Sequence, residues 1–133
     1  MRKWIILIMI ILLVSFSGCT KKPKYVEEEI FVETGSYKLP GKLTVPVTKK
    51  KVPAVIFVHG SGAADMDSKV GALKPFHDLA NGLAEKGIAS IRYDKRTFTY
   101  QSQLAKDYDF TIADEHVEDS LSAYTILAED KRI

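Results

Sequence analysis

The stretch that decides the fold of this sequence is Pro53-Ala54-Val55-Ile56-Phe57-Val58-His59-Gly60-Ser61-Gly62. Residues 54–58 form a continuous apolar run that is rich in β-branched side chains. Such a run is expected for a strand that is buried on both faces of a parallel sheet. Residues 59–62 add a glycine-containing turn at the carboxyl end of that strand. We therefore expect a buried strand that ends in a polar, glycine-containing loop.

The residues that follow predict a helix and a second buried strand. Within 74–86, four apolar residues recur at the helical spacing i, i+3, i+4 and i+7: Phe76, Leu79, Ala80 and Leu83. Gly87 is placed to end this helix, and 88–94 is again apolar and strand-like. Strand, helix and strand in succession make a βαβ unit, whose crossover is expected to be right-handed.

Two shorter strands are expected upstream of the decisive stretch. Residues 25–34 and 37–46 both show strand-like alternation, and Gly35-Ser36 between them indicates a tight turn. Two strands joined in this way form an antiparallel hairpin. Pro40 and Pro46 in the second strand fit the edge of a sheet better than its interior, because proline cannot donate to a ladder.

Downstream, residues 95–110 are expected to form a polar, aromatic loop, and residues 111–129 a last helix. Thr111 and Asp114 have the spacing of a capping arrangement at its start. The stripe expected to be buried on this helix consists of Ala113, Val117, Leu121, Tyr124 and Ala128. Residues 25–133 therefore predict one α/β domain, in which an antiparallel hairpin is followed by the βαβ unit and a further helix.

Residues 1–19 have the layout of an export signal, with Arg2 and Lys3 before an apolar run over 4–14. The run is about half of the roughly 20 residues that a membrane-spanning helix needs. Residues 16–19 resemble a bacterial lipobox, although Phe16 stands where leucine is preferred. The resemblance implies acylation of Cys19 with fatty acids such as palmitate. The expected protein is then exported and lipid-anchored to the extracytoplasmic face of a bacterial membrane, with 20–24 as a tether; an ordinary secretory signal is the alternative.

Charge and cysteine content exclude several classes of function. Arg2 and Lys3 are the only charged residues in 1–19, so the remaining chain has 17 basic and 17 acidic residues, and no basic excess predicts nucleic-acid binding. The single cysteine, Cys19, excludes an internal disulfide. Asp65, Asp67 and the three scattered histidines do not form a metal-ligand pattern, so no metal or other cofactor is expected. Gly60-x-Gly62 lacks the third glycine of a dinucleotide-binding loop.

The ordered set of strand, loop, helix, strand and helix resembles the first half of the α/β-hydrolase superfamily. The segments that carry the resemblance are 53–62, 74–89, 92–96 and 111–129. Arg92-Tyr93-Asp94-Lys95-Arg96 is similar to the segment after strand four in esterase and dienelactone-hydrolase-like members. The resemblance implies acyl transfer from an ester to water by a serine, a histidine and an acid, with backbone N–H groups that stabilise the oxyanion.

Within this resemblance, the backbone N–H groups of Ser61 and Gly62 are the candidates for an oxyanion hole, and His59 and Gly60 shape the loop. Ser61 as a nucleophile with His59 as its base is disfavoured, because side chains two residues apart on a strand end rarely face each other. Asp94 and Arg96 are expected to form a structural polar cluster after the second buried strand.

The 133 residues contain no Gly-x-Ser-x-Gly segment, the turn that carries the serine nucleophile in this superfamily. By the order of the family, the nucleophile, the acid and the histidine would lie beyond Ile133. The sequence thus predicts a domain truncated before strand five and inactive alone, which would take a small ester only when completed. The alternatives are a half-enzyme completed by a partner chain and a non-catalytic binding lipoprotein. Strand 54–58 would then be an exposed apolar edge, prone to self-association.

Overall fold

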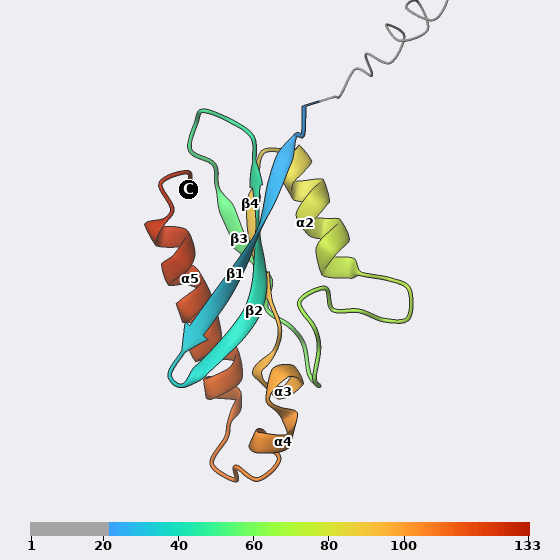
Figure 1. The fold of residues 1–133 in the computed structure, drawn as a ribbon, viewed down its shortest axis with the longest axis vertical. Helices are drawn as coiled ribbons and strands as arrows, with labels where there is room; N and C mark the ends of the chain where they lie inside the picture. Colours follow the sequence, from blue (N-terminus) through green and yellow to red (C-terminus); the bar gives the residue numbers. More distant parts are fainter. Residues whose placement is uncertain (1–21) are drawn as a thin grey trace, which may run out of the picture.

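The computed structural model of this chain describes residues 22–133 (Figure 1). In chain order its elements are β1 (Tyr25–Thr34), β2 (Tyr37–Pro46), β3 (Ala54–Ile56), α2 (Pro75–Glu85), β4 (Ala89–Tyr93), α3 (Arg96–Thr99), α4 (Gln101–Leu104), the π-helical segment η1 (Ala113–Glu118) and α5 (Asp119–Glu129). The predicted α/β arrangement of hairpin, βαβ unit and further helix is confirmed. Cys19 and the predicted signal lie outside the described residues. Within 22–133, no helix has the length and apolar character needed to cross a membrane.

The described strands form one sheet in the order β1-β2-β4-β3. β1 and β2 pair antiparallel along their whole length, and β2 pairs antiparallel with β4 through Gly41–Thr44. β3 runs parallel to β4, with α2 as the connection between them. Among the described residues, β1 and β3 are therefore the two edges of the sheet.

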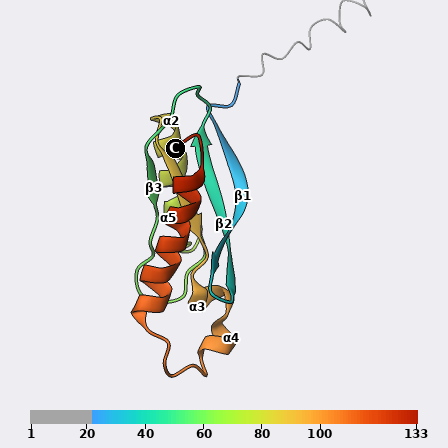
Figure 2. The same cartoon turned by 90° about the vertical axis from the view of Figure 1, so that its left-hand side faces the viewer.

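The two long helices cover opposite faces of the sheet (Figures 1 and 2). α2 packs on β4 and β2, whereas α5 packs on β1 and β3. The core between the sheet and α5 contains Val32, Leu39, Leu43, Val45, Ile91, Ala123 and Leu127. The carboxyl ends of β3 and β4 lie at the same end of the molecule as α3 and α4 (Figure 1), and this is the end where the candidate site forms.

The strand predicted over 54–58 is shorter in the structure, and Pro40 is placed differently from the prediction. The N–H of Phe57 still donates to the carbonyl of Ile91, at 3.0 Å, but the chain then leaves the sheet.

Pro40 lies on β2, an interior strand of the described sheet, so the prediction of an edge position was wrong. The proline is tolerated because pairing with β4 begins only at Gly41, and the carbonyl of Pro40 accepts from the N–H of Asp94 at 2.8 Å.

The predicted helix faces need two corrections. On α2, Ala80 and Ala84 are buried, whereas Leu79 is 53% exposed. On the last helix the predicted stripe is the exposed face, and the buried residues are Glu115, Asp119, Ala123 and Leu127. Apolar periodicity indicated the wrong face because two of the buried residues are carboxylates that pair with basic side chains following β4.

Residues 95–110 are not a continuous loop, since they contain α3 and α4. Each of these helices has only four residues, which is too short to produce a helical repeat of apolar side chains. Thr111 and Asp114 do interact as predicted: the N–H and the hydroxyl of Thr111 both donate to Oδ2 of Asp114, at 2.7 Å. The helical segment that follows begins as the π-helical η1.

Gly41 in β2 is the position where a side chain would fit least well. A Cβ there would lie 2.7 Å from the carbonyl oxygen of Arg92 and 2.9 Å from Cδ1 of Ile30. We expect Gly41→Ala to lower the free energy of unfolding by about 1–3 kcal/mol, because the nearest atom belongs to the backbone of a paired strand. Chemical denaturation measures this change.

Gly82→Ala is the matched control for this prediction. Gly82 lies inside α2, and a Cβ there would meet no atom within 4 Å. Alanine in a helix interior is favoured over glycine by about 1 kcal/mol, so this variant is expected to be more stable than the parent. Equal effects of the two substitutions would contradict the pairing of Gly41 with β4.

Candidate active site

The candidate site is the segment at the carboxyl end of β3, residues 59–63, which we call the glycine loop. It is followed by an irregular connection that leads to α2. Ser61, Gly62 and Ala63 are exposed, whereas His59 is 5% exposed. Gly62 has φ +85°, a left-handed conformation that favours glycine, but Gly60 has neither a positive φ nor a crowded Cβ position. Of the two glycines, therefore, only Gly62 is required by the backbone conformation.

His59 anchors the start of the glycine loop. Its Nε2 lies 2.8 Å from the carbonyl oxygen of Asp65 and therefore donates a hydrogen bond to it. Its ring packs against Phe76, with 5.0 Å between ring centroids, and meets Tyr93 edge-on. Burial lowers the pKa of His59, and this outweighs the hydrogen bond to Asp65, which acts in the opposite direction. A neutral imidazole whose Nε2–H is already used does not serve as a general base through that atom.

Lys95 is the central side chain beneath the glycine loop. Its side chain is 4% exposed, and its ammonium group donates to the carbonyl oxygens of Gly60, at 2.9 Å, and Gly62, at 2.8 Å. It also forms an ion pair with Oε2 of Glu115, at 2.9 Å. An ammonium has three N–H donors, so these three acceptors match its full capacity. The contacts fix the direction in which two peptide groups of the loop point.

The orientation of these carbonyls determines where the loop N–H groups point. In a trans peptide the C=O and the following N–H point in opposite directions, and no cis peptide occurs in the described chain. Because the carbonyls of Gly60 and Gly62 face Lys95, the N–H groups of Ser61 and Ala63 face away from it. Within residues 22–133, no hydrogen bond uses the N–H of Ser61, Gly62 or Ala63. The exposed side of the loop thus presents free backbone donors.

Glu115 connects Lys95 to the segment after β4. Its Oε1 accepts a hydrogen bond from the N–H of Thr97, at 2.9 Å, and another from the hydroxyl of Thr97. Burial would raise the pKa of Glu115, but the hydrogen bonds from Thr97 and Lys95 outweigh it, so the pKa lies below its ordinary value. At neutral pH this side chain is a carboxylate, buried but fully paired.

Two neighbours of Lys95 hold the rest of the connection between β3 and α2. Oδ1 of Asp94 accepts from the N–H of Met66 at 2.6 Å, and burial raises the pKa of this carboxyl. Nε of Arg92 donates to Oδ1 of Asp67 at 3.0 Å. Together with Lys95, these residues attach the whole connection to the carboxyl end of β4.

The sequence prediction that Asp94 and Arg96 belong to one polar cluster is wrong. The guanidinium of Arg96 pairs with Asp119 at the start of α5 and donates to Thr34 at the end of β1. Asp94 instead bonds the backbone of Met66. Lys95 and Glu115 were not predicted as site residues from the sequence. The signal that points to them is the dense charge of 92–96 at the carboxyl end of a buried strand, combined with two carboxylates four residues apart at 115 and 119.

The histidines on the two long helical segments, His77 and His116, form no hydrogen bond with the glycine loop within residues 22–133. His77 is partly exposed on α2 and bonds Asp78 and Asn81. Nδ1 of His116 lies 3.9 Å from Oε2 of Glu115. Within 22–133, no three histidine, cysteine, aspartate or glutamate side chains gather in a way that could hold a metal ion.

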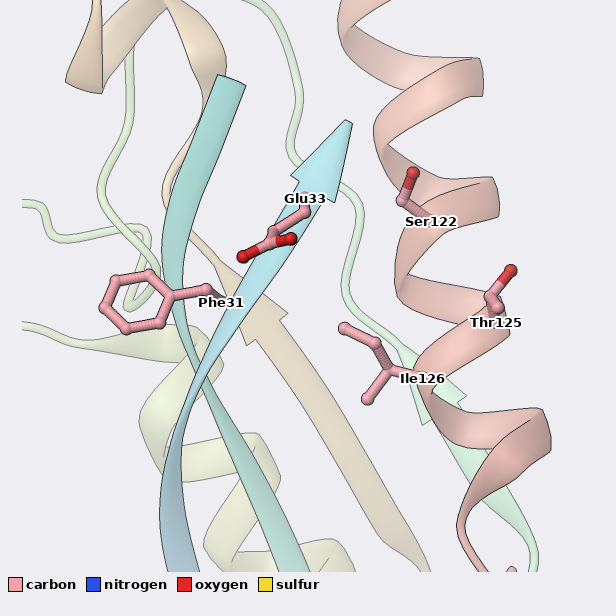
Figure 3. Close-up of a pocket in the computed structure, with 5 residues that line it drawn as sticks. All are labelled: Phe31, Glu33, Ser122, Thr125 and Ile126. Carbon is pink, nitrogen blue, oxygen red and sulfur yellow. The ribbon is translucent and has the colours of Figure 1, made fainter. Parts of the chain in front are cut away.

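Two surface hollows differ in their relation to the glycine loop. One, of about 280 Å³, lies at the open edge of β1 beside α5 (Figure 3). It is lined by Phe31, Glu33, Ser122, Thr125 and Ile126, none of which belongs to the loop. Figure 3 shows the ring of Phe31 on the far side of β1 from α5, so this hollow straddles a strand edge. The second, of about 320 Å³, includes Ala63 of the glycine loop itself.

Comparison with known proteins relates this chain to an enzyme. No protein-family model matches the sequence. The chain is 43% identical over 113 residues to Esterase EstD of Thermotoga maritima, an alignment that covers 84% of this chain. It spans only 27% of the length of that esterase. Most of this chain is therefore similar to about a quarter of an esterase, and the relationship suggests an esterase-like hydrolase.

Proposed function

We propose that this chain is part of an esterase-like hydrolase of the α/β-hydrolase type and supplies one side of its oxyanion hole. The observation that carries the proposal is the pair of hydrogen bonds that buried Lys95 donates to the carbonyls of Gly60 and Gly62. Because these carbonyls face Lys95, the N–H groups of Ser61 and Ala63 are directed outward, and they form no hydrogen bond among the described residues. The identity to an esterase over most of the chain supports the same class of reaction.

The chemical role of the loop follows from where charge develops during ester cleavage. Attack of a nucleophile on the ester carbonyl moves the C=O π electrons onto the oxygen, which becomes an oxyanion. Fixed backbone N–H donors stabilise that charge, and one such donor is worth roughly 10²–10³ in rate. The N–H groups of Ser61, Gly62 and Ala63 are available for this purpose. Lys95 contributes by holding the loop, because its own N–H groups are already used.

The nucleophile, the acid and the catalytic histidine are proposed to come from residues outside these 133, in the same protein or in a partner chain. The chain contains no Gly-x-Ser-x-Gly segment, and the environment of His59 is unsuited to base catalysis through Nε2. The 133-residue chain alone is then expected to be inactive toward esters.

An ester hydrolysis assay tests this assignment. Short p-nitrophenyl esters are offered to the 133-residue chain alone and to the native protein that contains it, with and without a fluorophosphonate that modifies active serines. We expect inhibitor-sensitive turnover only from a protein that also holds the nucleophile segment. Inhibitor-sensitive turnover by the chain alone would overturn the placement of the nucleophile, and absence of turnover by the native protein would overturn the class of reaction.

We further propose that Cys19 is acylated and anchors the protein to the extracytoplasmic face of a bacterial membrane. The support is the sequence pattern of residues 1–19 and the lipobox-like Phe16-Ser17-Gly18-Cys19. Two or more acyl chains give a stable anchor, whereas one gives only marginal binding. Metabolic labelling with a palmitate analogue is expected to mark the wild-type protein in the membrane fraction but not Cys19→Ser. Release of an unlabelled wild-type protein into the soluble fraction would favour an ordinary secretory signal.

A second copy of the chain is the proposed partner of the β3 edge. A groove of about 380 Å³ lies between this edge and α5, lined by Ala54, Ile56, Tyr124, Leu127, Ala128 and Ile133. Leu121 and Tyr124, on the outer face of α5, are 59% and 60% exposed. We expect the 133-residue chain to associate in a concentration-dependent manner in sedimentation velocity experiments. We expect Tyr124→Lys to weaken this association. The control Val70→Lys changes a residue that is also exposed but lies outside this groove. A monomer at all concentrations would contradict the proposal.

A further inference from the structure

We propose that the hollow beside the glycine loop binds the acyl chain of a short, uncharged ester, an inference that rests on the function proposed above. We call it the acyl hollow. Its lining residues are Ala63, Thr97, Gln101, Leu104, Ala105 and Phe110. They come from the glycine loop, from α3, from α4 and the residue that follows it, and from the segment before η1. The acyl hollow thus joins three stretches of chain at the carboxyl end of β4.

The position of Ala63 connects the acyl hollow to the oxyanion donors. Ala63 lines the hollow, and its N–H faces away from Lys95 because the carbonyl of Gly62 is bound to that ammonium. An ester carbonyl oxygen that accepts a hydrogen bond from the N–H of Ala63 is therefore bound by a residue that also lines the hollow. The substituent on the carbonyl carbon then has an adjoining apolar surface to occupy.

The lining selects an uncharged, apolar group. Ala63, Leu104, Ala105 and Phe110 provide apolar surface, and none of the six residues carries a charge. Thr97 offers no hydrogen-bond donor to a ligand, since both its N–H and its hydroxyl donate to Glu115. Gln101 is exposed, and within the described residues its side-chain amide has no hydrogen-bond partner, so it remains the polar group of the lining.

The size of the acyl hollow favours a short chain. Its volume of about 320 Å³ is near the lower end of ligand pockets in general, which span roughly 300–1,000 Å³. Leu104, 7% exposed on α4, is the most buried of its lining residues. Each CH₂ group that the hollow buries is expected to improve kcat/KM by about fourfold. The gain stops once the chain exceeds the available space.

The test is an acyl-length profile for the native protein and two variants. We measure kcat/KM for p-nitrophenyl acetate, butanoate, hexanoate and octanoate. Ala105→Leu places extra carbon atoms at the hollow, whereas Gln103→Leu makes an apolar change on an exposed residue of α4 that does not line it. We expect Ala105→Leu to reduce hexanoate turnover about tenfold relative to acetate, and Gln103→Leu to leave the profile unchanged.

Several results overturn the proposal. The same profile in Ala105→Leu as in the parent removes the acyl hollow from specificity, and so does an equal loss on all esters. Sensitivity to the alcohol part at constant acyl length would assign the hollow to the leaving group. If no ester is hydrolysed, the proposed function fails, and binding of hexanamide is followed by the methyl NMR signals of Ala63, Leu104 and Ala105. Saturable shifts there support the hollow as an apolar site, and their absence overturns it.

Discussion

Lys95→Met is expected to lower the free energy of unfolding by about 3–5 kcal/mol, the usual cost of removing one partner from a buried ion pair. The substitution leaves the carboxylate of Glu115 buried at 8% exposure without its cation. It also removes the donor from the carbonyls of Gly60 and Gly62. Chemical denaturation of the parent and the variant measures the loss.

The same substitution is expected to affect catalysis through orientation of the loop. Without the ammonium, the peptide groups after Gly60 and Gly62 are free to rotate, and the N–H groups of Ser61 and Ala63 lose their fixed direction. We expect kcat to fall at least about tenfold while KM changes little, because the lost interaction is made with the transition state. Lys95 is thus a positioning residue that acts through the loop backbone.

The double variant Lys95→Met/Glu115→Gln separates stability from orientation. Removing the uncompensated charge of Glu115 is expected to recover part of the stability, with a coupling of about 0.5–3 kcal/mol between the two sites. The kcat is expected to remain low, because methionine still cannot bind the two carbonyls. Recovery of kcat together with stability would show that Lys95 matters only for folding.

The elements that the sequence predicted well are those whose signal is local. The apolar run after Pro53, the helical spacing around Ala80 and the turn at Gly35-Ser36 each depend on residues a few positions apart. These patterns led to the hairpin and the βαβ unit, which the sheet order β1-β2-β4-β3 confirms. The position of the glycine loop follows directly, because a loop after a parallel strand lies at the carboxyl edge of the sheet.

The features that escaped prediction depend on contacts between distant residues. Glu115 and Asp119 look like solvent-facing positions in the sequence, yet they are buried because Lys95 and Arg96 neutralise them. A hydrophobic pattern cannot show this, since the cost of burying a carboxylate is offset by a partner about 20 residues away. The same pairing holds the glycine loop, so the error on the helix face and the omission of Lys95 have one cause.

Arg92→Met is expected to lower the free energy of unfolding by about 3 kcal/mol, whereas Arg132→Met is expected to cost less than about 1 kcal/mol. Each arginine holds two carboxylates. Arg92 binds Glu27 at 2.7 Å and Asp67 at 3.0 Å, and its side chain is 1% exposed. Arg132 binds Glu28 and Asp130, both at 2.6 Å, with a side chain that is 42% exposed.

The difference follows from solvent access, since both arginines have short contacts. The hydrogen bonds of Glu28 and then Asp130 raise the pKa of Arg132, but water and salt screen an exposed pair and reduce its contribution to stability. For Arg92, the variant leaves Glu27 and Asp67 partly buried without that cation, although Lys42 and Lys74 still contact them. These remaining lysines place the expected loss at the lower end for a buried pair. The measurement is chemical denaturation of both variants at low and high salt. Equal losses of unfolding free energy for the two variants, or a loss for Arg92→Met that disappears in 1 M salt, would show that burial does not set the strength of the Arg92 contacts.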